Sequence, residues 1–136
     1  MAILSQINYL GDLRTEAEHL ASSVKIITDA PIDNHGKGQA FSPTDLVSTA
    51  LAQCMITLMG IAANEHHIKL GRIEAEVTKI MGTNPRRISG IKVDLRIENL
   101  SFTEKEIAIL EKAAITCPVS QSLSTALNQE ISFNYF

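Results

Sequence analysis

The sequence predicts an α+β fold with a mainly antiparallel sheet. Three observations support this prediction: short alternating runs near both ends of the chain, two longer alternating runs in the middle, and helical patterns between them. Strands and helices that are grouped in this way are typical of α+β proteins. The chain has 136 residues, of which 45% are hydrophobic, so we expect a single domain over residues 1–136 with a substantial core.

The first strands are expected at residues 3–10, 14–20 and 24–28, where apolar and polar side chains partly alternate. Turn-forming residues separate the three runs, so an antiparallel meander is predicted. The following segment, residues 29–41, contains a proline, two glycines and several side chains that favour turns. We expect this segment to be an ordered loop that forms one wall of a site.

A long helix is expected from residue 43 to about residue 66. Ser42 suits the N-cap, Pro43 suits the first helical position, and Asp45 is placed to complete a capping box. The helix is apolar nearly all the way round, which is typical of a helix that its own domain or a partner chain buries. A single sheet covers only one side of such a helix, so we expect a second copy of the chain on the other side and an obligate homodimer.

The rest of the chain predicts two strands, two helices and a final strand. They are expected at residues 69–81, 88–98, about 102–114, 118–127 and 131–136. Thr103 is the predicted cap of the first of these helices, with Glu106 as its capping-box partner. The second is expected to start at Pro118, directly after Cys117.

Charge and hydropathy exclude several classes of partner. The net charge is −3 and the basic residues are scattered, so neither nucleic acid nor an anionic membrane surface is an expected partner. The longest apolar run, at residues 50–63, contains polar interruptions and is expected to fall short of a membrane span. The start of the chain lacks the apolar core of a signal peptide, so we expect a cytoplasmic protein. The adjacent His66 and His67 point in different directions on a helix, and no metal site is expected.

The two cysteines are the chemically informative residues. Cysteine is often buried, so two unrelated buried thiols are a serious alternative to one redox site. Cys117 adjoins Pro118 at a predicted helix start, where free backbone N–H groups and the helix dipole favour a thiolate. Cys54 lies about three turns inside the long helix, where the dipole is weak, and needs a cation from another segment. A thiolate attacks peroxide to give a sulfenic acid, which a second thiol converts to a disulfide.

Two segments resemble the OsmC/Ohr family of peroxide-reducing proteins. These are FSPTDLVSTALAQC at residues 41–54 and CPVS at residues 117–120, in this order and setting. The resemblance covers essentially the whole chain. It implies an OsmC-like fold: an intertwined homodimer in which antiparallel sheet encloses a long central helix from each chain, with two equivalent sites at the subunit interface.

The resemblance also implies roles for three residues. Cys54 matches the peroxidatic thiol of the family, and Cys117 matches the thiol that resolves its sulfenic acid. An arginine from the N-terminal strands activates the peroxidatic thiolate in the family. Arg14 is the candidate, because it follows the first hairpin turn and is the only arginine before the long helix.

One position departs from the family pattern. An acidic residue just after the helix-start proline usually holds the activating arginine, but Thr44 stands where the family commonly has Glu. Asp45 comes one residue later and points about a quarter turn away on the helix. Its alternatives are a clamp on Arg14 or the capping-box partner of Ser42. A looser clamp would orient Arg14 less well and lower the peroxidase efficiency.

The sequence therefore predicts a cysteine-based organic hydroperoxide reductase for oxidative stress defence, without metal or cofactor, that an external dithiol reduces. The apolar helix favours alkyl or lipid hydroperoxides over hydrogen peroxide. His35 is a candidate for substrate contact, and Met55 and Leu58 either line an apolar pocket or belong to the core. Two alternatives stay open: a dimeric protein that binds an apolar ligand and whose cysteines are only buried, and thiol-disulfide exchange or acyl transfer through Cys54.

Overall fold

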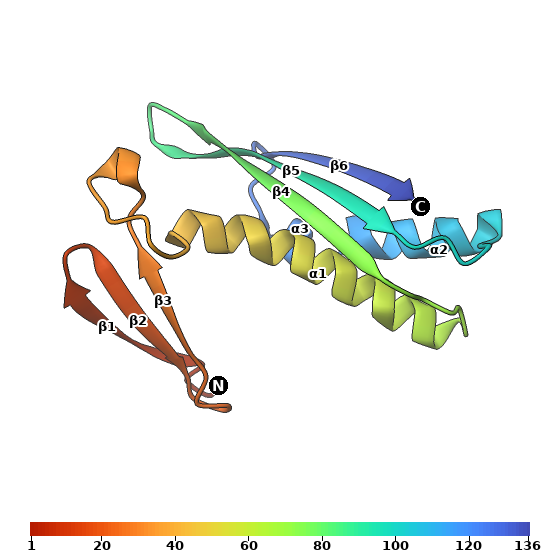
Figure 1. Ribbon diagram of the computed structural model, residues 1–136, viewed down its shortest axis with the longest axis horizontal. Coiled ribbons are helices and arrows are strands. Elements are labelled where there is room, and N and C mark those ends of the chain that lie inside the picture. The colour runs from red at the N-terminus through yellow and green to blue at the C-terminus, as the bar shows by residue number, and fades with distance from the viewer. The chain divides into compact units, whose positions relative to one another are not determined.

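The computed structural model describes residues 1–136, and the chain forms two compact units. They are Met1–Val47, called the N-terminal unit below, and Ser48–Phe136, called the C-terminal unit. Each unit contains one three-stranded sheet, and the α-helices stand between strands in the order of the chain (Figure 1). The α+β class is therefore confirmed, but the strands form two sheets and not one. That residues 1–136 act as a single domain stays a prediction.

The N-terminal unit begins with the antiparallel meander that the sequence predicts. Its strands, in spatial order, are β1 (Ser5–Gly11), β2 (Arg14–His19) and β3 (Lys25–Asp29). Between β1 and β2, Asp12 and Leu13 have φ values of 53° and 62°. A two-residue type I′ turn requires positive φ at both central positions, and this turn matches the twist of the strands. Arg14 is thus the first residue of β2, paired with Gly11 across the turn.

The register of the meander separates an apolar face from a charged face. Ile7 pairs with Ala17, and Ala17 pairs with Ile26, so these side chains share one face of the sheet. Tyr9 lies on the same face, two residues after Ile7. Ile7 and Tyr9 remain 65% and 67% exposed. An apolar sheet face with this much exposed surface is typical of a surface that another part of an assembly covers.

The loop after β3 is ordered, as predicted, and includes a short 3₁₀ helix at Ile32–Asn34. The loop returns on itself at Gly36, where a Cβ atom would overlap the carbonyl oxygen of Ala30. Only glycine allows this close approach of the two backbone segments. At the end of the loop, the N–H of Asp29 donates to the carbonyl of Phe41 at 3.1 Å. The loop therefore closes beside the end of β3.

The remaining elements follow in sequence. They are α1 (Pro43–Glu65), β4 (Ile73–Gly82), β5 (Arg87–Ile97), α2 (Glu104–Ile115), α3 (Pro118–Ser122) and β6 (Asn128–Tyr135). The sheet order is β4-β5-β6, with β4 antiparallel to β5 and β6 parallel to β5. The strand pairings are thus mainly antiparallel, as expected, and β6 is the parallel exception. Its physical reason is the crossover through α2 and α3, which returns the chain to the same end of β5 before β6 starts.

α3 is shorter than the predicted helix over residues 118–127. It ends at Ser122 because Leu123 is extended, with φ −79° and ψ 154°. The hydroxyl of Ser124 then accepts from the N–H of Ala126 at 3.1 Å, and the carbonyl of Ser124 accepts from Leu127 at 3.0 Å. Local bonds of this kind favour a turn over a continued helix. β6 consequently starts at Asn128, before the predicted residue 131.

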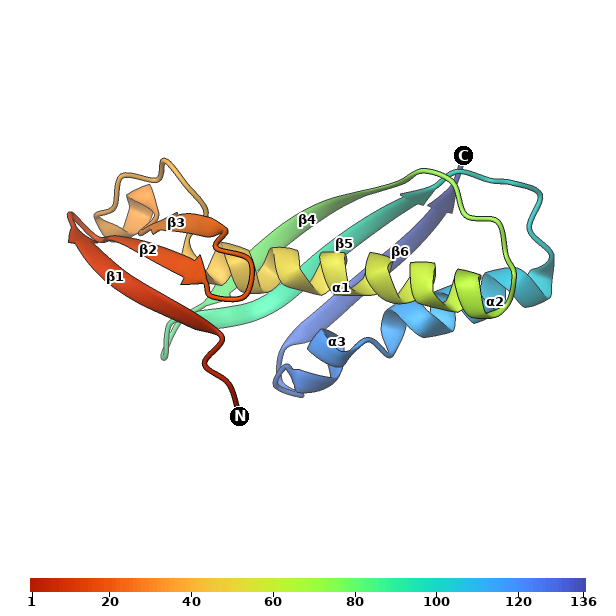
Figure 2. The same ribbon diagram turned by 90° about the horizontal axis from the view of Figure 1, so that it is seen from below.

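The core of the C-terminal unit lies between its sheet and two helices. α1 and α2 lie on the same side of β4-β5-β6 (Figure 2). Most of the core's buried apolar side chains come from β5, α1 and α2, and they include Ile91, Val93, Leu95, Ile97, Leu51, Met55, Met59, Leu110 and Ala114. The buried apolar residues of β5 alternate along the strand, as the sequence pattern predicts. This core holds α1 and the segment after α2 in place.

α1 is long and apolar enough to cross a membrane by length and composition alone. This corrects the expectation that the apolar run is too short. The run of uncharged residues begins before residue 50, and its polar interruptions are uncharged, so they weaken its apolar character only slightly. The core helix of a soluble protein satisfies the same test, and Leu51, Met55 and Met59 of α1 pack in the core of the C-terminal unit.

Candidate functional site

The two cysteines meet in the C-terminal unit although they are far apart in the sequence. Cys54 comes from the middle of α1, and Cys117 is the N-cap residue of α3. Both are free thiols, and the side chain of Cys54 lies close enough to Cys117 to raise the pKa of that thiol. Cys54 is half-buried, whereas Cys117 is fully buried within the core. The fold therefore places an accessible thiol beside an enclosed one.

Opposing effects act on the Cys117 thiol. Its Sγ accepts from the backbone N–H of Ser120 at 3.4 Å, as expected of an N-cap residue. Burial is the largest effect and raises the pKa of Cys117, while the N–H groups of Ser120 and Val119 lower it and the neighbouring Cys54 raises it further. The net pKa lies above the ordinary value of a thiol. Burial thus disfavours the Cys117 thiolate more strongly than the N–H groups of the helix start favour it.

A polar pair holds α3 against β6 and was not predicted from the sequence. The hydroxyl of Ser120 donates to Oε1 of Gln129 at 2.7 Å, and Nε2 of Gln129 donates to the carbonyl of Ser120 at 3.2 Å. The N–H of the same Ser120 donates to Cys117. Gln129 thereby fixes the residue whose N–H donates to the Cys117 sulfur. Ser120 belongs to the recognisable CPVS segment, but only the position of β6 identifies its partner.

Arg14 of the N-terminal unit is held by a carboxylate that the sequence analysis missed. Nε of Arg14 donates to Oδ1 of Asp29 at 2.7 Å, and Nη2 donates to Oδ2 at 2.8 Å. Nη2 also donates to Oε1 of Gln39 at 3.0 Å. The hydrogen bonds with Asp29 raise the pKa of Arg14, and those with Arg14 lower the pKa of Asp29. A signal for Asp29 exists in the sequence, because it ends a strand that pairs with the strand of Arg14.

The polar residues at the start of α1 form a capping box. The N–H of Ser42 donates to Oδ2 of Asp45 at 2.9 Å, and the N–H of Asp45 donates to the hydroxyl of Ser42 at 3.1 Å. The hydroxyls of Ser42 and Thr44 lie 3.2 Å apart and share a hydrogen bond. Of the two alternatives for Asp45, the capping-box role is confirmed.

The remaining predicted site residues differ in their accessibility. His35 ends the short 3₁₀ helix with a φ of 65° and is exposed. Met55 is 0% exposed and lies in the core cluster, and Leu58 packs against that cluster from α1. Met55 is thus a core residue of its own unit, and substrate contact by Met55 stays a prediction. Substrate contact by His35 or Leu58 stays a prediction.

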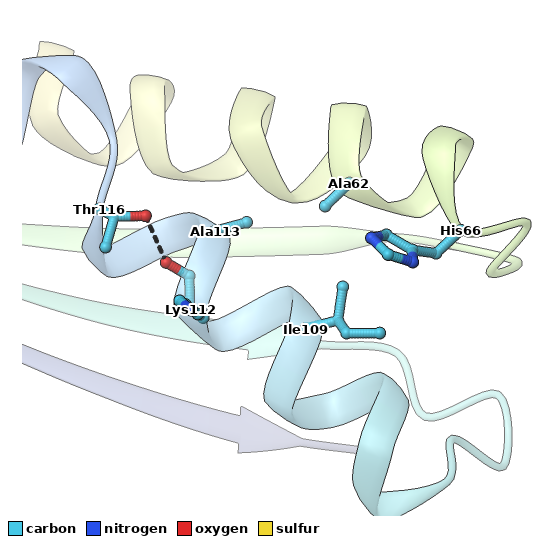
Figure 3. A pocket seen from close by; sticks show the side chains of 6 residues that line it. All are labelled: Ala62, His66, Ile109, Lys112, Ala113 and Thr116. Carbon is cyan, nitrogen blue, oxygen red and sulfur yellow. Dashed lines mark hydrogen bonds between the residues drawn. The ribbon is translucent and has the colours of Figure 1, made fainter.

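One open cavity of about 370 Å³ lies in the C-terminal unit, between the ends of α1 and α2 (Figure 3). Its lining residues are Ala62, His66, Ile109, Lys112, Ala113 and Thr116. Within it, the hydroxyl of Thr116 donates to the carbonyl of Lys112 at 2.7 Å. Neither cysteine lines this cavity. Its connection to the thiol pair is that Thr116, which lines the cavity, directly precedes Cys117 in the sequence.

Comparisons with known proteins place these observations in a family context. The family model described as OsmC-like protein matches residues 36–132. A protein of Psychrobacter arcticus 273-4, provisionally described as an osmotic stress induced and detoxification response protein, is 44% identical. The alignment covers 98% of this chain and 97% of that chain, with a TM-score of 0.92. No curated protein sequence matches the chain.

Two more distant solved structures share the fold. An organic hydroperoxide resistance protein OsmC of Legionella pneumophila, also described as a predicted redox protein, is 19% identical, with 98% of each chain covered and a TM-score of 0.72. The organic hydroperoxide resistance protein OhrB of Bacillus subtilis is 16% identical, with 98% of each chain covered and a TM-score of 0.61. At these identities the likeness concerns the fold alone.

Proposed function

Because the chain belongs to the OsmC-like protein family, we propose that it reduces organic hydroperoxides, with Cys54 as the peroxidatic thiolate and Cys117 as the resolving thiol. Family membership connects the chain with osmotic stress or hydroperoxide detoxification. The observation that carries the finer proposal is the contact between the two thiols, which come from α1 and from the start of α3. A buried structural cysteine needs no such partner.

The proposed reaction has three steps. The Cys54 thiolate attacks the peroxide oxygen, the O–O bond breaks, and the alkoxide leaves as an alcohol after it takes a proton. Cys54 is then a sulfenic acid, oxidised by two electrons. Cys117 loses its proton and attacks the sulfur of Cys54, which releases water and forms a disulfide. An external dithiol supplies two electrons and two protons that restore both thiols.

The difference in exposure of the two thiols supports this division of roles. Cys54 is half-buried and lies within reach of a substrate, whereas Cys117 is enclosed and has a raised pKa. A protonated, enclosed thiol is a poor first nucleophile, because the thiolate is the reactive form. It is well placed to react with an intermediate on the neighbouring sulfur. We assign the activation of Cys54 to Arg14, the residue that matches the activating arginine of the family.

The proposal includes a homodimer and a cytoplasmic location. The fold indicates a soluble protein. Exposed apolar side chains on one face of the meander and on α1, such as Tyr9 and Ile61, support a partner chain on these surfaces. Light scattering is expected to give twice the chain mass of 14.8 kDa. A measured mass of one chain at micromolar protein concentration would contradict the dimer.

The reaction is tested with cumene hydroperoxide under single-turnover conditions. The reduced protein is expected to consume one equivalent of hydroperoxide per site and to lose both thiols. Cys117→Ser is expected to consume one equivalent and leave a sulfenic acid on Cys54 that dimedone traps. Cys54→Ser is expected to be inactive, and full turnover by this variant would refute the proposal.

The same experiment separates the alternative functions. Intact thiols after excess hydroperoxide would favour a protein that binds an apolar ligand. Rapid reaction of Cys54 with a disulfide or a thioester, without reaction with hydroperoxide, would favour exchange or acyl transfer. Hydrogen peroxide serves as the comparison substrate and is expected to react more slowly than cumene hydroperoxide, because an apolar environment favours a substrate with a carbon skeleton.

A further inference from the structure

The bidentate ion pair between Arg14 and Asp29 is shorter and more buried than the ion pairs Lys25–Glu16 and Lys37–Asp12 of the N-terminal unit. Two parallel N–H···O bonds of 2.7 and 2.8 Å join the Nε/Nη2 edge of the guanidinium to both oxygens of the carboxylate. The Asp29 side chain is 0% exposed, and the Arg14 side chain is 26% exposed. A fork of this geometry fixes the plane of the guanidinium as well as its position. The pair of Lys25 with Glu16, at 3.9 Å, is longer and less buried.

Asp29 is itself held from three directions. It is the partner of Arg14 in the register of β2 and β3. Its Oδ2 accepts the N–H of Gln39 at 3.0 Å, and its own N–H donates to the carbonyl of Phe41. The Gln39 side chain completes the arrangement by accepting from Nη2 of Arg14. The position of the buried Asp29 carboxylate is therefore fixed by several contacts. They come from the end of β3, from the loop that follows it and from the first residue of β2.

The usual anchor of the family is absent from this chain. Thr44 stands where the family commonly has Glu, and Asp45 is engaged in the capping box with Ser42. We propose that Asp29 is the positioning residue for Arg14 and takes over the anchoring role that a glutamate at position 44 performs in the resembling family pattern. This inference deepens the proposed function and rests on it, since it assumes that Arg14 acts on Cys54.

The geometry of the pair leaves part of Arg14 available. Asp29 and Gln39 occupy Nε and Nη2, whereas Nη1 makes no hydrogen bond within the chain. Nη1 thus carries N–H donors in a fixed direction, which suit an anionic sulfur or a peroxide oxygen. Loss of the carboxylate would leave the charge of Arg14 unchanged but release its orientation. A thiolate would then lose a directed donor, and Cys54 would react more slowly at a given pH.

The test compares the pH profile of Cys54 alkylation in the full-length protein and its variants. Asp29→Asn keeps the size of the side chain and an acceptor for the Gln39 N–H but removes the charge-assisted fork. At neutral pH its Cys54 is expected to react with iodoacetamide about tenfold more slowly than the wild type, a profile displaced by about one pH unit. Arg14→Ala is expected to give a similar displacement. Mass spectrometry of the Cys54 peptide separates this reaction from alkylation of Cys117.

Two further variants separate positioning from folding. Glu16→Gln removes a carboxylate from the same sheet, at a site with only the long pair to Lys25, and is expected to keep the wild-type profile. Asp29→Asn combined with Thr44→Glu restores a carboxylate at the family position and is expected to recover at least half of the displacement. A merely structural role of Asp29 would not produce recovery from a carboxylate added at a different position. Circular dichroism confirms that each variant is folded.

The outcomes distinguish this inference from the proposed function. A wild-type profile in Asp29→Asn together with a displaced profile in Arg14→Ala would overturn the positioning role and leave the peroxidase proposal intact. Unchanged profiles in both variants would overturn the positioning role along with the role of Arg14. Failure of the wild type to consume cumene hydroperoxide would overturn the proposed function, which the alkylation profiles do not measure.

Discussion

Gln129→Leu tests how far the disulfide-forming step depends on the contact between β6 and α3. The substitution keeps the approximate volume of the half-buried side chain and removes two hydrogen bonds, of 2.7 and 3.2 Å, to Ser120. A typical net contribution is about 0.5–1.5 kcal/mol per bond. We therefore expect the free energy of unfolding to fall by about 1–3 kcal/mol, measured by urea denaturation of the reduced protein.

The functional consequence concerns Cys117 and not the first attack. Ser120 donates its N–H to Cys117, so a displaced Ser120 weakens the hydrogen bond that holds that sulfur. If about 1.4 kcal/mol of the loss falls on disulfide closure, this step slows about tenfold. Stopped-flow consumption of cumene hydroperoxide is expected to keep its wild-type rate. Dimedone is expected to trap more sulfenic acid on Cys54 in the variant than in the wild type.

Gln121→Leu is the matched control. Gln121 lies on α3, is exposed, and makes no side-chain hydrogen bond in the structure. Its substitution is expected to change the free energy of unfolding by less than about 0.5 kcal/mol and to leave closure unchanged. Equal sulfenic acid trapping in Gln129→Leu and wild type would refute the reasoning. An equal loss of unfolding free energy in both variants would also refute it, because the loss would then not depend on the hydrogen bonds of Gln129 to Ser120.

Two further predictions concern stability. The pKa of Cys117 is raised in the folded state, so the folded protein holds this proton more strongly than the unfolded chain does. The resulting stabilisation is complete below the ordinary thiol pKa of 9.0. It is lost as the pH rises towards the folded-state pKa. Cys117→Ser is expected to show a smaller fall in unfolding free energy above pH 9 than the wild type, and parallel curves would contradict it. Leu110→Ala, at a side chain that is 0% exposed, is expected to cost about 2–5 kcal/mol by urea denaturation. Lys105→Ala, at an exposed position of the same helix, is expected to cost less than about 0.5 kcal/mol, and similar losses in the two variants would refute the placement of Leu110 in the core.

Local patterns in the sequence were sufficient for most elements. The meander, the long helix and the amphipathic helix after it follow from alternation, periodicity and capping signals, which depend on neighbouring residues only. The capping box of Thr103 and Glu106 is present, with bonds of 2.9 and 3.1 Å. The end of α3 was missed because a turn at Ser124 competes with the helix through local bonds of comparable strength.

The candidate site was predictable in its residue types but not in its partners. The cysteines and Arg14 could be named from their segments, whereas Asp29 and Gln129 could not, because neither belongs to a recognisable motif. Asp29 becomes the partner of Arg14 through the register of two strands, and Gln129 reaches Ser120 through the parallel pairing of β6. Both depend on contacts between segments that are distant along the chain.

The sequence by itself determined the α+β class, the family resemblance and the two thiols, because these depend on residue identity and on short-range periodicity. Only the tertiary structure decided that the two thiols meet and that burial raises the pKa of Cys117. It likewise decided that a strand-end aspartate, and not the helix start, holds Arg14. The physical reason is that desolvation and hydrogen-bond geometry are properties of packed neighbours, which the order of residues specifies only through the complete fold.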